Sequence, residues 1–383
     1  MPEQRADTAQ QLIALLRAAL HGEPFRADAD TDWTALTRLA AKHNLQYAAA
    51  KAALEDGNAA ALPPELLAQL QKHYLQSLAV CETQRFEARR LMEAFAERGL
   101  TVMPIKGVCT RARYPDAPLR SMGDLDFLCR AEQTRAVRAA MQALGYTDFR
   151  EGRKNDYYRL PPYVLVEMHR ELLAAESGQY GFWRDVWDRS EADAELPGVH
   201  RMRPEDEYLF NLVHLAEHFR EGGAGIRFLM DVWVYERTPL DRAYLDAELG
   251  RMGLGDFYDN VRAVAEHWFE ETAPTLTPLQ ERLAAFILDN SVFGDRRNAA
   301  SLAVRRGRAA SLLRVCFPDY ESMRSMFPWL AKAPALLPAS WAPRGCRALL
   351  HRPEQVRHKL DQILHGDREQ GRSLQAFFES CGL

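Results

Sequence analysis

The spacing of apolar residues changes twice along the chain, and these two changes constrain the fold more than any other feature. Through the first hundred residues, apolar positions recur at helical spacing. Three short runs of strand type follow Gly99, at residues 100–105, 124–129 and 163–169. From Pro204 the helical pattern returns almost to the end. The sequence therefore predicts a small sheet region between two helical regions.

Helical segments separate the three predicted strands. Gly99 has the position of a glycine that ends a helix, and Gly145 has the same position after a predicted helix at 131–144. Lys106-Gly107 is expected to turn the chain into a short helix at 108–113. Strand, short helix, strand, helix and strand make a compact core, so we expect an α+β fold. The expected segments are a helical N-terminal region at 1–75, an α/β core at 76–200 and a helical C-terminal domain at 201–383.

Composition places the chain among ordinary globular proteins. Its 383 residues hold 49 Lys and Arg against 53 Asp and Glu, a formal net charge of −4 that gives no strong nucleic-acid signal. No run approaches the ~18 to 20 apolar residues of a membrane-spanning helix. The N-terminus lacks the order of a signal peptide, and the six cysteines include no C-x-x-C pair. We therefore expect a cytoplasmic protein without a membrane segment.

An acidic pair opens the second predicted strand. Side chains alternate along a strand, so Asp124 and Asp126 project to one side while Leu125 and Phe127 project to the other. Adjacent carboxylates on one face repel each other and favour a hard divalent cation such as Mg²⁺. Triplets of this kind also arise by chance in a chain with 53 acidic residues, so a solvated surface pair is the alternative.

The third predicted strand carries a further carboxylate. Glu167 and His169 share one face of the run 163–169, and the apolar residues between them face the other way. A carboxylate in an apolar strand is costly unless it is paired or bound to metal. If the second and third strands are neighbours, Glu167 becomes a third carboxylate beside the acidic pair. The alternatives are a salt bridge from Glu167 to an arginine and a structural role for His169.

A possible phosphate site precedes the acidic pair. Lys106 and Gly107 stand at the start of the short predicted helix, where a lysine and free backbone N–H groups point at one place. Arg120 and Ser121 could add donors to the same anion. A surface position for Lys106 is the alternative.

Several of these residues lie in longer motifs: Ile105-Lys106-Gly107, Met122-Gly123-Asp124-Leu125-Asp126-Phe127-Leu128 and Val166-Glu167-Met168-His169. Together the motifs resemble the uncharacterised nucleotidyltransferase family of the DNA polymerase β-like superfamily. The resemblance implies a short mixed sheet with helices on one side, two metal ions, and transfer of NMP from an NTP to an acceptor with release of pyrophosphate. Superfamily members usually have Gly-Ser in the turn that Lys106-Gly107 occupies here.

This resemblance assigns roles to the residues already singled out. It implies that Asp124, Asp126 and Glu167 are catalytic and hold Mg²⁺ or Mn²⁺, and that an NTP such as ATP contacts the phosphate-site residues Lys106, Gly107, Arg120 and Ser121. The acceptor would be a small molecule, a protein or an RNA.

Two other functions remain open from the sequence. A nucleotide-binding or interaction protein of the same fold would keep these motifs without turnover. A zinc hydrolase is a further alternative, because His214, Glu217 and His218 have the H-x-x-E-H spacing of inverted zinc peptidases. Glu270 or Glu271 would then supply a third ligand, whereas hydrogen bonding in the core explains the two histidines equally well.

Overall fold

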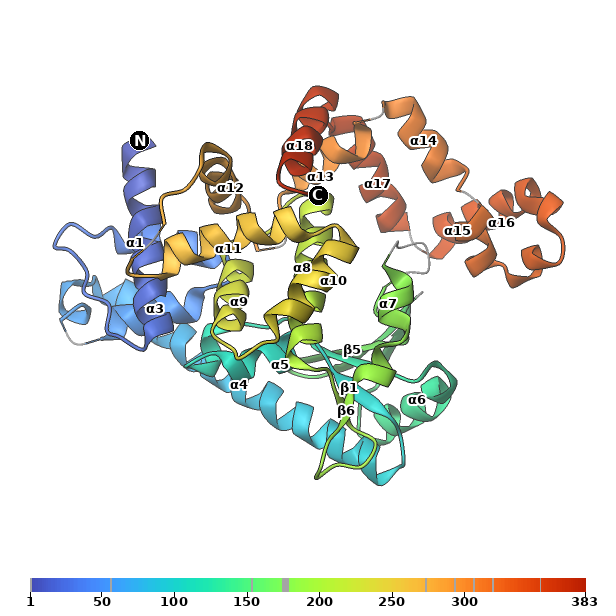
Figure 1. The fold of residues 1–383 in the computed structure, drawn as a ribbon, viewed down its shortest axis with the longest axis horizontal. Coiled ribbons are helices and arrows are strands. Elements are labelled where there is room, and N and C mark those ends of the chain that lie inside the picture. Colours follow the sequence, from blue (N-terminus) through green and yellow to red (C-terminus); the bar gives the residue numbers. More distant parts are fainter. Residues whose placement is uncertain are drawn as a thin grey trace. The chain divides into compact units, whose positions relative to one another are not determined.

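The computed structural model confirms the α+β fold (Figure 1). It describes residues 2–55, 57–152, 154–173, 179–272, 274–292, 294–305, 307–318, 320–351 and 353–383. The chain forms two compact units: one comprises Met1–His214 and Ile226–Ala284, and the other comprises Leu215–Gly225 and Ala285–Leu383. The division into segments at residues 75 and 200 stays a prediction.

A five-stranded mixed sheet forms the centre of the first unit. Its strand order is β1-β2-β5-β4-β3. The strands are β1 (Val102–Pro104), β2 (Leu125–Cys129), β3 (Asp148–Glu151), β4 (Asn155–Leu160) and β5 (Val164–His169). Only β2 and β5 run parallel, and their register places Asp126 beside Glu167 and Leu128 beside His169. The predicted neighbouring of the second and third strand runs is therefore confirmed.

The β3–β4 hairpin lies where the sequence predicted no strand. Charged residues interrupt its apolar pattern, and Asp156 at its centre is buried. Arg138 and Arg170 neutralise Asp156 at 3.3 and 2.7 Å. Phe149 pairs with Tyr158 across the hairpin, and β4 also pairs with β5 along its whole length. Partners distant in sequence thus stabilise these strands, which local spacing does not reveal.

Two helices cover one face of the sheet. They are α4 (Pro64–Glu97), the long helix that runs past the sheet in Figure 1, and α6 (Thr134–Ala143). Their apolar faces form one core with alternate residues of β2 and β5, namely Leu125, Phe127, Val164, Val166 and Met168. Because strand side chains alternate, Asp126, Glu167 and His169 project from the opposite face.

The end of α4 confirms the predicted helix-ending glycine. Gly99 has a φ of +64°, a conformation that side chains with a Cβ adopt at a cost. The N–H of Gly99 donates to the Ala96 carbonyl at 3.0 Å, and the N–H of Leu100 donates to the Phe95 carbonyl at 2.9 Å. This cap turns the chain directly into β1.

Helices precede and follow the sheet along the sequence, as predicted. The first unit also contains α1 (Pro2–His21), α2 (Trp33–Lys42), α3 (Gln46–Leu54), α5 (Gly107–Thr110), α7 (Tyr180–Arg184), α9 (Ile226–Glu236), α10 (Arg242–Met252) and α11 (Gly255–Phe269). Two helices continue into the second unit, α8 (Pro204–Glu221) and α12 (Pro278–Asp289). A two-stranded sheet joins β6 (Glu191–Ala192) to β7 (His200–Arg201). Every residue of α9 from Ile226 to Tyr235 is buried, including Arg227 and Asp231.

The second unit is helical. Its helices are α13 (Arg296–Val304), α14 (Arg308–Cys316), α15 (Tyr320–Met326), α16 (Leu337–His351), α17 (Pro353–His365) and α18 (Arg368–Ser380). Gly371 of α18 lies against the Ser301 carbonyl of α13 and leaves no room for a Cβ. None of the helices in the described part of the chain is long and apolar enough to span a membrane.

Candidate metal and nucleotide site

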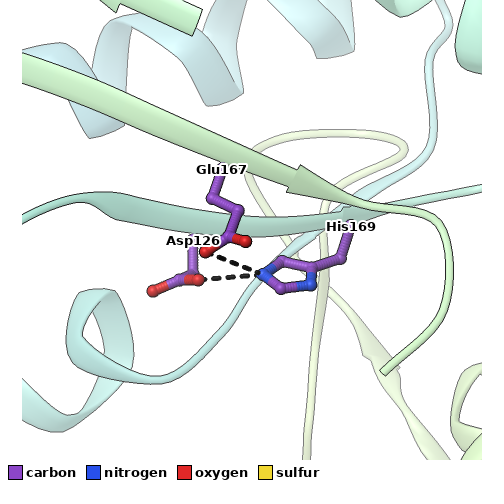
Figure 2. Close-up of side chains that lie close together, drawn as sticks. All are labelled: Asp126, Glu167 and His169. Atoms are coloured by element: carbon purple, nitrogen blue, oxygen red, sulfur yellow. Dashed lines mark hydrogen bonds and ion pairs between the residues drawn. The ribbon is translucent and has the colours of Figure 1, made fainter. Parts of the chain in front are cut away.

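Asp126, Glu167 and His169 lie together on the sheet face opposite α4 and α6 (Figure 2). Asp126 is the second residue of β2, and the other two come from alternate positions of β5. One ligand atom of each residue lies within 4.8 Å of the others, and no second such group occurs among the described residues. Two carboxylates and an imidazole are donors that Mg²⁺, Mn²⁺ and other divalent ions accept.

Asp126 is at the centre of a short network. Its Oδ1 accepts a hydrogen bond from Lys106 Nζ at 2.8 Å and another from His169 Nε2 at 2.9 Å. Burial alone would raise the pKa of Asp126, but the Lys106 ammonium and the His169 hydrogen bond outweigh burial and lower it. Asp126 is therefore ionised at neutral pH, although only 5% of its surface is exposed.

Lys106 reaches this network through an unusual backbone conformation. Its φ of 51° and ψ of −126° match the first central position of a type II′ turn, which glycine usually occupies. The predicted turn between β1 and α5 is present, but Lys106 rather than Gly107 takes the glycine-like conformation. A Cβ at Gly107 would lie against the Met122 sulfur and 2.7 Å from Arg120 Nη1, so the ends of these two side chains would have to shift. Strained backbone of this kind clusters at functional sites.

Asp124 precedes β2 and lies outside the group of three ligand side chains. Burial raises its pKa to about 6. The charges of Asp126 and Glu167 also raise this pKa, and together they outweigh the lowering by Lys106 and Arg120. Burial is the main cause of this raised pKa, and the neighbouring carboxylates add to it.

Asp124→Asn is expected to stabilise the metal-free protein at pH 8 and to leave its stability at pH 4 nearly unchanged. The folded pKa of about 6 exceeds the ordinary 3.8, so the folded state keeps a proton that the unfolded state loses between these values. The free energy of unfolding therefore falls as pH rises through this window, by up to about 3 kcal/mol. Urea unfolding of both proteins at the two pH values measures this difference. An equal difference at pH 4 and pH 8 would contradict the electrostatic cause.

The structure gives Arg120 and Ser121 protein partners. Arg120 donates from Nε and Nη2 to the two oxygens of Asp231 at 3.1 and 2.9 Å, and Tyr114 donates to the same carboxylate at 2.7 Å. The hydroxyl of Ser121 donates to the Asn44 carbonyl at 2.7 Å. Arg120 Nη1 nevertheless stays close to Gly107, which leaves one edge of the guanidinium beside the turn.

Three residues near the predicted site were not predicted to hold a metal ion or a phosphate. His169 was expected to orient a carboxylate, to contact the acceptor or to have a structural role, although the alternation that places Glu167 on this face places His169 there too. Arg227 and Asp231 lie one turn apart in α9, and Asp231 pairs with Arg120. Opposite charges inside an otherwise apolar helix were the available signal for this pair.

The histidines of the H-x-x-E-H motif lie along α8. Neither His214 nor His218 belongs to a group of three metal-ligating side chains in the described part of the chain. Glu270 and Glu271 belong to no such group either. The His214 ring lies 6.2 Å from the Phe228 ring, a distance typical of aromatic packing. Within the described ranges, no third metal-ligating side chain joins these two histidines.

Comparison with known proteins identifies the first unit's family. A family model described as "Uncharacterised nucleotidyltransferase" matches residues 29–270, which include β1 to β5 and the Asp126, Glu167 and His169 group. No curated protein and no solved structure matches the chain. The matched segment spans more than half of the 383 residues. The chain therefore belongs to the uncharacterised nucleotidyltransferase family.

Proposed function

We propose that this protein is a metal-dependent nucleotidyltransferase that moves NMP from an NTP to an acceptor and releases pyrophosphate. Family membership supports nucleotidyl transfer in general. The observation that carries the finer proposal is the convergence of Asp126, Glu167 and His169 on one sheet face, with Lys106 bonded to Asp126.

The charges of this group fit a divalent cation. Asp124, Asp126 and Glu167 bring three carboxylates together, and Lys106 is the cation bonded directly to one of them. Burial raises the pKa of Asp124, and the charges of Asp126 and Glu167 raise it as well. Asp126, Glu167 and His169 would hold Mg²⁺ or Mn²⁺, and the ion would neutralise charge on the transferred phosphoryl group.

The protein's own side chains would position the reactants. An acceptor hydroxyl attacks the α-phosphorus, the bond from that phosphorus to the bridging oxygen breaks, and pyrophosphate leaves with the bridging oxygen. Lys106 and Gly107 would contact the phosphates from the turn after β1, where the lysine already faces the carboxylates. Asp124 would add a third carboxylate to this site, as the sequence pattern predicts.

Thermal unfolding with ligands tests this proposal. Wild-type protein and the Asp124→Ala/Asp126→Ala double variant would be heated with each of the four NTPs, with and without Mg²⁺. A ligand that binds only the folded state adds about 2.7 kcal/mol of stability at a hundred times its dissociation constant. We expect a Mg²⁺-dependent rise in the unfolding temperature of the wild type with at least one NTP, and no such rise for the variant.

Two other outcomes count against the proposal. An equal rise in the unfolding temperature of both proteins would mean that the nucleotide does not bind at the acidic pair. A rise in the wild type without pyrophosphate release across small-molecule, protein and RNA acceptors would favour a nucleotide-binding protein that has lost turnover.

A further inference from the structure

Three buried arginines and one buried carboxylate lie beside the proposed site. Arg111, Arg120 and Arg227 expose 5%, 6% and 5% of their surfaces, and Asp231 pairs with Arg120 and Arg227. Arg120 takes both oxygens of Asp231. Arg111 instead donates to the Arg120 carbonyl at 3.0 Å and to Gln84 Oε1 at 2.8 Å, which are neutral acceptors. The cluster therefore holds three positive charges and one negative charge.

Arg227 is the least satisfied member of this cluster. Its Nη1 lies 3.7 Å from Asp231 Oδ2, too far for a hydrogen bond, and both Nε and Nη1 are buried without a partner among the described residues. Arg111 Nη1 is buried without a described partner as well. Burial and the nearby Arg120 charge lower the pKa of Arg227 to about 10, so it remains charged at neutral pH. Buried charges and N–H groups without partners are costly unless a ligand satisfies them.

Single unpartnered nitrogens are not unusual in this protein, and Arg227 differs from them. Arg113 and Arg189 each have one such nitrogen, but each also holds a carboxylate, Glu207 or Asp206, at 3.0 Å or less. Arg227 has two unpartnered nitrogens and no carboxylate at hydrogen-bond distance. Two buried donors of Arg227 are therefore available to an acceptor from outside the described residues.

The cluster lies next to the Lys106-Gly107 turn and the acidic pair. Arg120 Nη1 approaches the position of a Gly107 Cβ to 2.7 Å, and the Asp124 charge acts on Arg227. Met122 is partly buried and packs its sulfur against Gly107 beside Arg120. The arginine cluster therefore lies beside the Lys106-Gly107 turn, with the flexible Met122 side chain next to both.

We propose that Arg227, supported by Arg120 and Arg111, binds the terminal phosphates of the nucleotide and then the pyrophosphate that leaves. The assignment to a nucleotide rests on the proposed transferase function, whereas the affinity for a polyphosphate rests on the arginine cluster itself. The guanidinium holds its N–H donors in fixed directions, and phosphate oxygens are strong acceptors for such donors. The excess positive charge would stabilise the negative charge that develops on the leaving group.

Calorimetric titration with tripolyphosphate, ATP and AMP, each with Mg²⁺, tests this inference. Arg227→Gln is expected to weaken tripolyphosphate and ATP by about 10- to 100-fold, because charged hydrogen bonds to the phosphates are lost. AMP lacks the terminal phosphates and should bind within twofold of wild type. Arg189→Gln is the matched control, since Arg189 is also partly buried and ion-paired, and it should leave all three affinities unchanged.

Arg227→Lys is a second variant that keeps the test valid if Arg227→Gln does not fold. It keeps the charge and loses the fixed N–H donors of the guanidinium, so we expect a loss of about tenfold for tripolyphosphate. Tripolyphosphate binding that is absent in the wild type, or equal in the wild type and a folded Arg227 variant, would overturn the inference. Loss of tripolyphosphate binding in the variants of a protein that transfers no NMP would support the polyphosphate site and reject the transferase. If the protein transfers NMP and the variants bind tripolyphosphate as tightly as the wild type, the transferase is supported and the polyphosphate site is rejected.

Discussion

Asp126→Asn is expected to lower nucleotidyl transfer by about 100- to 1,000-fold, in line with the loss of a group that stabilises charge in a transition state. Asp126 lies at the centre of the site, where its Oδ1 holds both Lys106 and His169. Asparagine keeps the size of the side chain but removes the charge that a divalent ion and the Lys106 ammonium both need. Pyrophosphate release in the presence of an NTP and acceptor measures the effect.

Glu151→Gln is the control for this measurement. Glu151 belongs to the same sheet, at the end of β3, and its side chain is 65% exposed, so its neutralisation should leave transfer unchanged. The unfolding midpoint of Asp126→Asn must also be measured, because the substitution removes the charged partner of Lys106. Transfer within threefold of wild type by a folded Asp126→Asn protein would contradict the site.

Asp231→Asn is expected to lower the free energy of unfolding by about 3 to 5 kcal/mol, the usual cost of leaving a buried charge without its partner. Asp231 is 3% exposed and accepts two hydrogen bonds from Arg120 and one from Tyr114. Without this carboxylate, the cluster of Arg111, Arg120 and Arg227 contains positive charges alone. Denaturant unfolding measures the loss.

An exposed ion pair supplies the comparison for Asp231→Asn. Glu82 and Arg85 lie one turn apart on α4 with side chains 63% and 59% exposed. Glu82→Gln should therefore cost less than about 1 kcal/mol. If Asp231→Asn costs no more than Glu82→Gln, the buried cluster does not have the uncompensated charge that the polyphosphate proposal requires.

Strand alternation made much of the site predictable from sequence. A period of two placed Asp124 and Asp126 on one face, and it placed Glu167 and His169 together on the next strand run. The structure adds the β2–β5 register, which sets Asp126 directly beside Glu167. Local spacing was sufficient here because each strand has one apolar face and one polar face.

Contacts between distant segments were not predictable in this way. Arg120 was expected to face an anion, yet its Asp231 partner lies 111 residues later in a buried helix. The β3–β4 hairpin depends on its pairing with β5 and on arginines that neutralise Asp156. The positive φ of Lys106 has no signature in residue type, because glycine is the residue that usually adopts it. Each of these features is fixed by tertiary structure.

Mn²⁺ binding to the wild type and to Asp126→Asn, followed by the electron paramagnetic resonance signal of the free ion, tests the central claim most directly. The claim is that Asp126, Glu167 and His169 hold a divalent ion that the nucleotide also contacts. We predict that the wild type binds Mn²⁺ more tightly when ATP is present, and that the variant loses at least about 100-fold in affinity, since even residues behind the ligands contribute 10- to 100-fold. Equal Mn²⁺ affinity in the two proteins, or no binding by the wild type with ATP, would contradict the account.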